Sequence, residues 1–205
     1  MRYARLWIAS VLLFSGAALA ETRPYALEVL IFARPDPVHS IDEVFPSEAP
    51  PVPESMDLRF ATESRFRNMI PLPASSRVLI NAARRIETEM RGQILFHERW
   101  IHPLTPGQQN NPWFRVTGQG TNAISLEGYL RWSIDRFIEV DADLRVSRQG
   151  IRMDREGLPL DTIYVLREFR KMSSKDIHYL DHPAFGVIIA SEQIELLEDP
   201  EVLGQ

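Results

Sequence analysis

The segment FIEVDADLRVS, residues 137–147, carries the clearest strand pattern in the chain. Its apolar residues share one parity, namely Ile138, Val140, Ala142, Leu144 and Val146. Asp141, Asp143 and Arg145 take the opposite parity. Such alternation is typical of an antiparallel strand with one buried and one solvated face. This segment therefore predicts a sheet that is mostly antiparallel.

Other segments repeat strand-like patterns along the chain. They are residues 25–33, 93–102, 113–117, 124–134, 162–172 and 186–194. Residues 25–33 are apolar almost throughout, with Glu28 as their only charge, which is typical of a strand covered on both faces. The link over residues 149–161 is polar and contains Gly150, Gly157 and Pro159, which predicts a hairpin connection.

A single helix is predicted over residues 73–92. Its apolar residues recur at spacings of three and four: Val78, Leu79, Ala82, Ala83, Ile86 and Met90. Gly92 is a natural helix end. The apolar side would cover a sheet or, alternatively, bind a partner. We expect an α+β fold: a mostly antiparallel curved β-sheet of about seven strands with one long amphipathic helix packed on a face.

Residues 1–20 have the pattern of a secretory signal peptide. Arg2 and Arg5 precede an apolar run over residues 6–14, and Ala18-Leu-Ala20 fits the small-x-small cleavage pattern. The alternative is an uncleaved N-terminal anchor. We expect export to the periplasm and no membrane segment after cleavage, because no later apolar run approaches about 18 residues.

The rest of the chain, residues 21–205, is expected to form a single α+β domain. Residues 34–73 are rich in proline, which disfavours regular ladders and predicts a long loop. That loop is either loosely packed on the domain or an arm that binds a partner. Phe45, Phe60 and Met69 are among the side chains that could attach it to the domain.

Composition excludes several classes of function. The chain contains no cysteine, which excludes disulfides, thiol chemistry and a lipid-modified N-terminal cysteine. The formal net charge is −5, which argues against nucleic acid or an anionic membrane surface as the main partner. There is no Gly-x-Ser-x-Gly motif and no glycine-rich phosphate loop. We therefore expect no enzymatic activity and no cofactor.

Titratable side chains are densest in residues 167–186, REFRKMSSKDIHYLDHPAFG. His178, Asp181 and His182 offer metal-ligand types, and the two histidines have the i, i+4 spacing of helical zinc sites. Pro183 disfavours helix at His182. A periplasmic metal-binding protein or metallohydrolase using these three residues is thus an alternative hypothesis. In the competing interpretation, these side chains form turn and capping hydrogen bonds between two strands.

Aromatic and arginine side chains on the predicted strands could bind a glycan or an acidic ligand. Trp100 and Trp132 could stack on sugar rings, and Arg131, Arg167 and Arg170 could pair with carboxylates. The alternative is that the aromatic residues belong to the core or to cross-strand pairs. The candidate binding residues are Trp100, Trp132, Arg131, Arg167, Arg170, His178, Tyr179, Asp181 and His182.

The C-terminal third resembles the CsiV family of exported proteobacterial proteins. The residues that carry the resemblance are Glu168, Arg170, Met172, Ser174 and the run IHYLDHPAFG at 177–186, followed by an apolar strand. The first strand, YALEVLIFA at 25–33, and Trp100 near the end of a strand also fit. The chain departs from the family pattern at Phe169, where arginine is usual, and at Asp176-Ile177, where Glu-Leu is usual.

The resemblance implies a periplasmic peptidoglycan-binding protein that supports cell-wall synthesis. It further implies a partner, an outer-membrane lipoprotein that activates a class A penicillin-binding protein. It brings no catalytic residues. A third hypothesis is a scaffold without wall affinity that engages only protein through the proline-rich loop.

Overall fold

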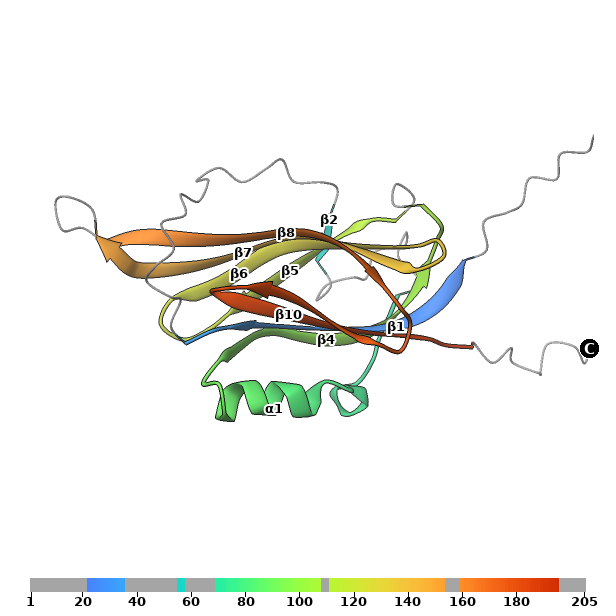
Figure 1. Cartoon of the computed structure of the whole chain (residues 1–205), viewed down its shortest axis with the longest axis horizontal. Helices are drawn as coiled ribbons and strands as arrows, with labels where there is room; N and C mark the ends of the chain where they lie inside the picture. Colours follow the sequence, from blue (N-terminus) through green and yellow to red (C-terminus); the bar gives the residue numbers. More distant parts are fainter. Residues whose placement is uncertain (1–21, 36–54, 58–68, 108–110, 154–158, 196–205) are drawn as a thin grey trace, which may run out of the picture.

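The computed structural model describes residues 22–35, 55–57, 69–107, 111–153 and 159–195. Within these ranges it contains strands, one 3-10 turn (η3) and one α-helix (Figure 1). The elements are β1 Arg23–Ala33, β2 Ser55–Asp57, β3 Ile70–Pro71, η3 Ala74–Ser76, α1 Ile80–Thr88, β4 Gln93–Leu104, β5 Trp113–Gln119, β6 Ile124–Ile134, β7 Ile138–Met153, β8 Pro159–Met172, β9 Ile177–His182 and β10 Phe185–Gln193. No helix in the described ranges is long and apolar enough to cross a membrane.

The strands form two five-stranded sheets that pack face to face (Figure 1). Sheet A has the order β3-β4-β1-β10-β9, and sheet B has the order β2-β5-β6-β7-β8. Nearly all neighbours are antiparallel; the exception is β2, which runs parallel to β5. The prediction of one curved sheet carrying a long helix is therefore wrong. The apolar face of the strands is buried mainly against a second sheet.

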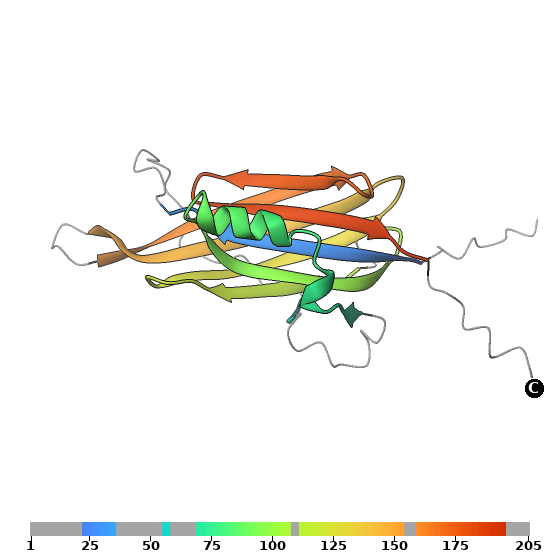
Figure 2. The same ribbon diagram turned by 90° about the horizontal axis from the view of Figure 1, so that it is seen from below.

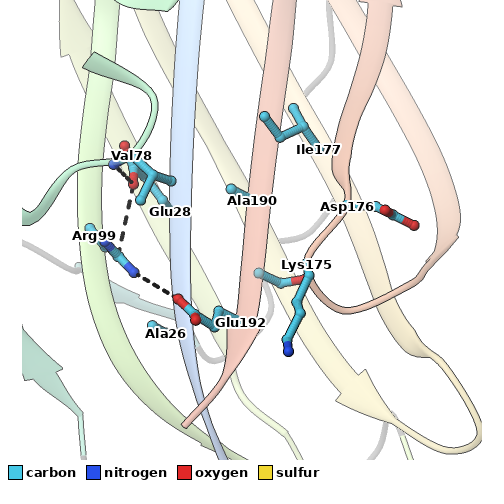
Figure 3. Close-up of a pocket in the computed structure, with 10 residues that line it drawn as sticks. Ala26, Glu28, Val78, Arg99, Lys175, Asp176, Ile177, Ala190 and Glu192 are labelled. Carbon is cyan, nitrogen blue, oxygen red and sulfur yellow. Dashed lines mark hydrogen bonds and ion pairs between the residues drawn. The ribbon is translucent and has the colours of Figure 1, made fainter. Parts of the chain in front are cut away.

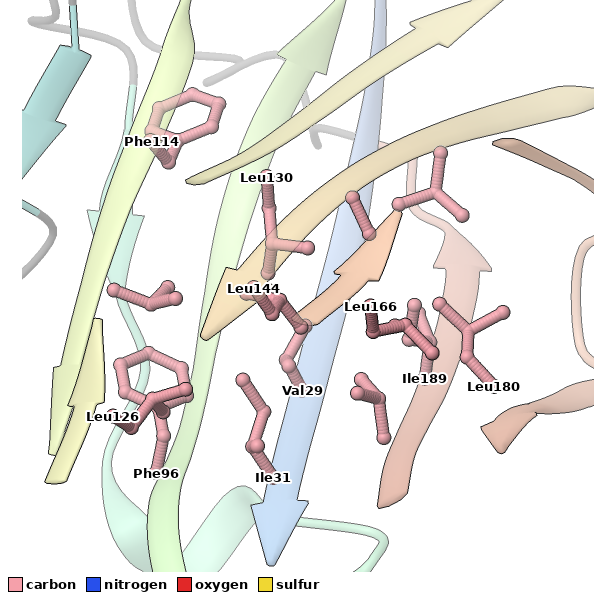
Figure 4. Close-up of a cluster of buried hydrophobic side chains, with 14 of the residues drawn as sticks. Val29, Ile31, Phe96, Phe114, Leu126, Leu130, Leu144, Leu166, Leu180 and Ile189 are labelled. Carbon is pink, nitrogen blue, oxygen red and sulfur yellow. The ribbon is translucent and has the colours of Figure 1, made fainter. Parts of the chain in front are cut away.

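The main core fills the space between the two sheets. Val29 and Ile31 of β1 meet Leu130 of β6 and Leu144 of β7 in one buried cluster (Figure 4). Gly118 of β5 marks a close approach of the sheets, since a Cβ there would lie 2.0 Å from the carbonyl oxygen of Leu95. The alternation predicted for residues 137–147 is confirmed, because Val140, Ala142, Leu144 and Val146 are all buried.

The helix is shorter than predicted and covers only part of sheet A. It has nine residues, and Ala83 and Ile86 pack on Leu30 and Phe32 of β1. Figure 2 shows it lying across the outer face of that sheet. The segment before it forms η3 instead of helix, and Arg91 adopts a left-handed φ of 54° just before Gly92. Val78 and Met90, predicted on the buried side, are exposed because they lie beyond the helical ends.

The C-terminal hairpins also differ from the sequence-based prediction. Strand β7 runs on to Met153 and β8 begins at Pro159, so the connection between them is shorter than the predicted 149–161. Residues 177–182, predicted as part of a turn, form the edge strand β9. Leu180 and His182 are buried, whereas Ile177 and Asp181 are exposed. The sequence did not reveal this alternation, because polar residues occur on both the buried and the exposed side of the strand.

Two short strands of the proline-rich segment lie within the described residues. Strand β3 pairs with β4, and β2 pairs with β5, so both add short edges to the sheets. Met69 packs against the main core, as predicted. Phe45, Phe60 and Phe66 lie outside the described residues.

We expect buried His102 to make the fold sensitive to mild acid. Burial lowers the pKa of His102 from 6.5 to about 4. As pH falls from 6.5 to 4 the unfolded chain takes up a proton at this side chain and the folded chain does not, so the free energy of unfolding declines. Across this window the wild type should lose about 3 kcal/mol relative to His102→Leu. Urea unfolding at pH 7 and pH 4.5 measures the difference, and parallel pH profiles for the two proteins would contradict it.

Candidate functional site

The two tryptophans proposed for sugar stacking lie in the core between the sheets. Trp132 of β6 is fully buried, and Trp100 of β4 meets it edge to face with ring centroids 5.3 Å apart. Phe114 of β5 closes the same aromatic cluster at 5.7 Å from Trp132. A sugar could reach these rings only by opening the sandwich. They are core residues, because both take the inward parity of their strands.

Arg131 and Arg167 lie on the outer face of sheet B, away from the core. We call this surface the arginine face; it comprises Trp113, Arg115, Tyr129, Arg131, Asp141, Asp143, Arg145 and Arg167. Figure 1 shows the four long strands β5–β8 that carry it side by side. The register places Arg115, Tyr129, Asp143 and Arg167 in one row across these strands. Sheet geometry thus gathers arginines from distant parts of the sequence.

Each arginine of the arginine face is held by an acidic neighbour or a ring. Arg131 donates to Asp141 at 2.7 Å, and its guanidinium lies 4.4 Å from the centre of the Trp113 ring. Asp143 lies between Arg145, at 3.0 Å, and Arg167, at 3.4 Å. Stacking on Trp113 orients the Arg131 guanidinium and leaves a broad amphipathic surface, the kind that binds sugar rings and carboxylates together.

Arg170 lies apart from the arginine face. It belongs to the edge strand β8 and pairs with Glu168 two residues earlier, with Nε at 3.0 Å from the carboxylate. Both side chains take the parity that faces the core in the middle of the sheet, but at this edge they remain partly exposed. Arg170 therefore does not join Arg131 and Arg167 in one site.

Strand β9 separates the four candidate residues that it carries. Tyr179 and Asp181 point outward and meet Arg34 at the end of β1: Arg34 donates to Tyr179 at 2.8 Å and to Asp181 at 2.6 Å. Tyr179 donates in turn to Asp181 at 2.7 Å. The hydrogen bond from Tyr179 and the Arg34 guanidinium lower the pKa of Asp181, whereas burial raises the pKa of Tyr179. This cluster ties the end of β1 to the edge of sheet A.

The proposed metal ligands do not converge. His178 and His182 share the inward parity of β9, and Asp181 takes the outward one. Four residues along a strand span about 13 Å, which is far more than a metal ion can bridge. No group of three or more acidic or histidine side chains able to hold a metal was found among the described residues.

His182 has a structural place in the turn between β9 and β10. It is buried, its Nδ1 accepts the backbone N–H of Ala184 at 3.1 Å, and its ring stacks on Phe185 at 4.7 Å. The ring of Tyr164 of β8 meets the His182 ring edge to face, with centroids 5.8 Å apart. Next to it, a Cβ on Gly186 would lie 2.6 Å from the Phe32 ring and 2.7 Å from the Tyr179 hydroxyl. The motif that carries the family resemblance therefore builds a tight hairpin.

A pocket on the outer face of sheet A was not predicted from the sequence. It measures about 340 Å³, and its residues come from β4, β1, β10, the segment just before α1, and the turn before β9 together with the first residue of β9 (Figure 3). Its lining is Ala26, Glu28, Val78, Arg99, Lys175, Asp176, Ile177, Ala190, Ser191 and Glu192. The one feature of the sequence that could have indicated this pocket is Glu28, the only charge in the apolar run at residues 25–33.

Glu28 is a buried carboxylate with its hydrogen bonds satisfied. It accepts the N–H groups of Val78 at 2.7 Å and Leu79 at 2.9 Å, just before α1, and His97 Nε2 lies 2.8 Å away. Because a carboxylate only accepts, His97 Nε2 carries the proton in this contact. Burial alone would raise the pKa of Glu28, but the hydrogen bonds from His97, Leu79 and Val78 outweigh it and lower the pKa.

We expect Glu28→Gln to destabilise the fold by about 2 kcal/mol at pH 7, because the amide removes the negative charge and replaces one of the two acceptor oxygens with a donor NH2 group. The lowered pKa makes this contribution fully present above the ordinary value of 4.5 and progressively lost as pH falls through the folded-state pKa. Urea unfolding from pH 7 down to pH 3 measures the gap between variant and wild type. A gap that stays constant over this range would argue against the carboxylate as its source.

We expect His182→Ala to lower stability by roughly 2 kcal/mol, through loss of ring packing and of the turn hydrogen bond. Binding to isolated cell walls, measured well below the melting temperature, should stay unchanged. Tyr179→Phe is the control on the same strand: it removes the hydroxyl that contacts Arg34 and Asp181 but keeps the ring. Lost binding with an unchanged melting temperature would assign His182 to the ligand instead.

The comparisons with known proteins agree with the resemblance seen in the sequence. A family model described as "Peptidoglycan-binding protein, CsiV" matches residues 4–194. No curated protein and no solved structure matches the chain. Because the matched range covers nearly the whole sequence, the chain belongs to the CsiV family.

Proposed function

We propose that this chain is a non-enzymatic, exported protein that binds peptidoglycan in the periplasm. The observation that carries the proposal is the family match over residues 4–194. In this proposal residues 1–20 are a cleavable signal peptide, and residues 21–205 form the mature domain with the proline-rich segment at 34–73. The domain supports cell-wall synthesis by holding the wall rather than by cutting or joining it.

The arginine face is the wall-contacting surface in this proposal. Peptidoglycan combines sugar rings with short peptides that carry carboxylates. The Trp113 ring suits a sugar or acetyl group, and the guanidinium groups of Arg131 and Arg167 suit carboxylates. The acidic partners Asp141 and Asp143 orient those arginines, so a ligand carboxylate would meet preset donors. Trp100 and Trp132 are left out, since both are buried.

A protein partner is also part of the proposal. The family resemblance supports an outer-membrane lipoprotein that activates a class A penicillin-binding protein. Binding both the wall and such a partner would place the activator near its substrate. The metallohydrolase alternative is not carried forward, because His178, Asp181 and His182 are spread over both faces of β9.

Co-sedimentation of the exported protein with purified sacculi tests wall binding. We expect the double variant Arg131→Gln/Arg167→Gln to bind about tenfold more weakly, since two charge-assisted contacts are lost. The control Arg84→Gln/Arg85→Gln changes the charge equally on the exposed side of α1, where Arg84 contacts Asn81 and Arg85 contacts Glu89, and should bind like the wild type.

Three results would count against this assignment. Equal binding of both double variants would move the site away from the arginine face. Raising the salt from 50 to 500 mM shortens the Debye length from about 14 Å to about 4 Å, so binding that does not change over this range would contradict a charge-based contact. Failure of the wild type to co-sediment would refute the proposed function itself.

A further inference from the structure

The pocket on the outer face of sheet A exists because small side chains, Ala26 and Ala190, form its floor. The register aligns Ile177, Ala190, Glu28 and Arg99 in one row across β9, β10, β1 and β4. Ala190 lies between larger neighbours, and Ala26 lies on β1 beside Glu28, two residues along the strand. Helix α1 covers this face farther along, over Leu30 and Phe32, and stops short of the pocket. A depression therefore remains beside the start of the helix.

Two solvent-exposed aliphatic side chains form the walls of this pocket. Val78 is 56% exposed and Ile177 is 65% exposed, and both line the pocket from opposite sides (Figure 3). Ile80, in the first turn of α1, adds a third exposed aliphatic side chain nearby in sequence. Single exposed apolar residues are common, but a pair flanking a hollow points to a binding surface.

Most of the charges in the pocket are already neutralised. Glu28 is held by His97 and two backbone N–H groups, and Arg99 contacts Glu192 at 3.4 Å. Arg99 also donates to the carbonyl of Ser76. In Figure 3 the carboxylate of Asp176 points away from Val78 and Glu28. Two rim charges, Lys175 and Asp176, then remain without an ion-pair partner among the described residues, and Lys175 is the cation of the two.

The backbone at Lys175 is itself unusual. Its φ of 72° lies in the left-handed region, which glycine and asparagine adopt at little cost and lysine does not. The turn is nevertheless held in place, since the Lys175 N–H donates to the Ser191 carbonyl at 2.7 Å. A strained position whose ammonium group has no acidic partner among the described residues, at the rim of an apolar hollow, favours a role in binding.

We propose that this pocket docks an acidic peptide segment of a partner protein. An aliphatic side chain of that segment enters between Val78 and Ile177, and a neighbouring carboxylate pairs with Lys175. The described residues of the lining include no aromatic ring, and aromatic rings are the stacking surface that sugar sites use. The pocket lies on sheet A and the arginine face on sheet B, so the inference goes beyond wall binding and does not depend on it.

Peptide titration of the isotope-labelled exported protein tests the proposal. The probe is acetyl-Ala-Leu-Glu-Ala-amide, with three matched peptides in which Glu becomes Gln, Glu becomes Lys, or Leu becomes Ser. We expect the Leu-Glu peptide to shift the amide signals of Val78, Ile177 and Ala190. The Gln peptide should bind about tenfold more weakly, because one charge-assisted contact is missing, and the Lys and Ser peptides more weakly still.

Variants of the protein locate the contacts. Lys175→Gln should abolish the preference for Glu over Gln, while Lys171→Gln, which changes the only other lysine and lies on sheet B beside Glu139, should leave it intact. Ala190→Leu should fill the hollow and remove binding of every peptide. If the larger side chain at position 190 prevents folding, Ile177→Ser replaces that variant in the test. It changes an exposed residue of the pocket wall and should also weaken binding of every peptide.

The outcomes separate this site from the proposed wall-binding function. Lys175→Gln and Ala190→Leu should co-sediment with sacculi like the wild type. Loss of sacculus binding in either folded variant would place peptidoglycan in the pocket and overturn the assignment to a protein partner. Absence of shifts at the pocket residues, equal affinity for the Glu and Gln peptides, or a preference for Lys would overturn it as well.

Discussion

Strand β1 is buried on both faces, and the rest of the structure depends on this constraint. Nine consecutive residues from Tyr25 to Ala33 are buried, so both faces of the strand need a cover. Sheet B supplies one cover and helix α1 the other. Glu28 is the single charge in this stretch, and it is tolerated because its carboxylate is bonded to His97 and to two N–H groups before α1. The same contacts anchor the helix to the sheet.

The two outer faces of the sandwich have different chemistry. The arginine face of sheet B is a ladder of alternating charges with Trp113 at one edge, a polar surface suited to a sugar-peptide polymer. The outer face of sheet A carries the helix and the aliphatic pocket beside it. Under the two proposals made above, the wall binds one outer face and a protein binds the other, so the two ligands do not compete.

The motif at 177–186 identifies the family through structure more than through chemistry. Leu180 and His182 fill the core, Tyr179 and Asp181 hold Arg34, and Gly186 makes room for the Tyr179 ring against Phe32. Each of these residues makes a packing or hydrogen-bond contact that stabilises the β9–β10 hairpin at the edge of sheet A. Dense titratable groups can therefore mark a tightly specified turn, and their density alone does not indicate an active site.

The sequence by itself determined where most strands lie and, over residues 137–147, which side chains face inward, because alternation follows directly from the two-residue period of a strand. It also identified Ala83 and Ile86 as the buried side of the helix, and it identified the family. Only the tertiary structure decided that the strands split into two sheets, since alternation defines a face but not what covers it. The same limit explains why Trp100 and Trp132 turned out to be core while Arg131 stayed on the surface. Arg34 and Asp181 are 147 residues apart, and the pocket joins five segments. Such long-range neighbours follow from strand order and packing, which no local pattern encodes.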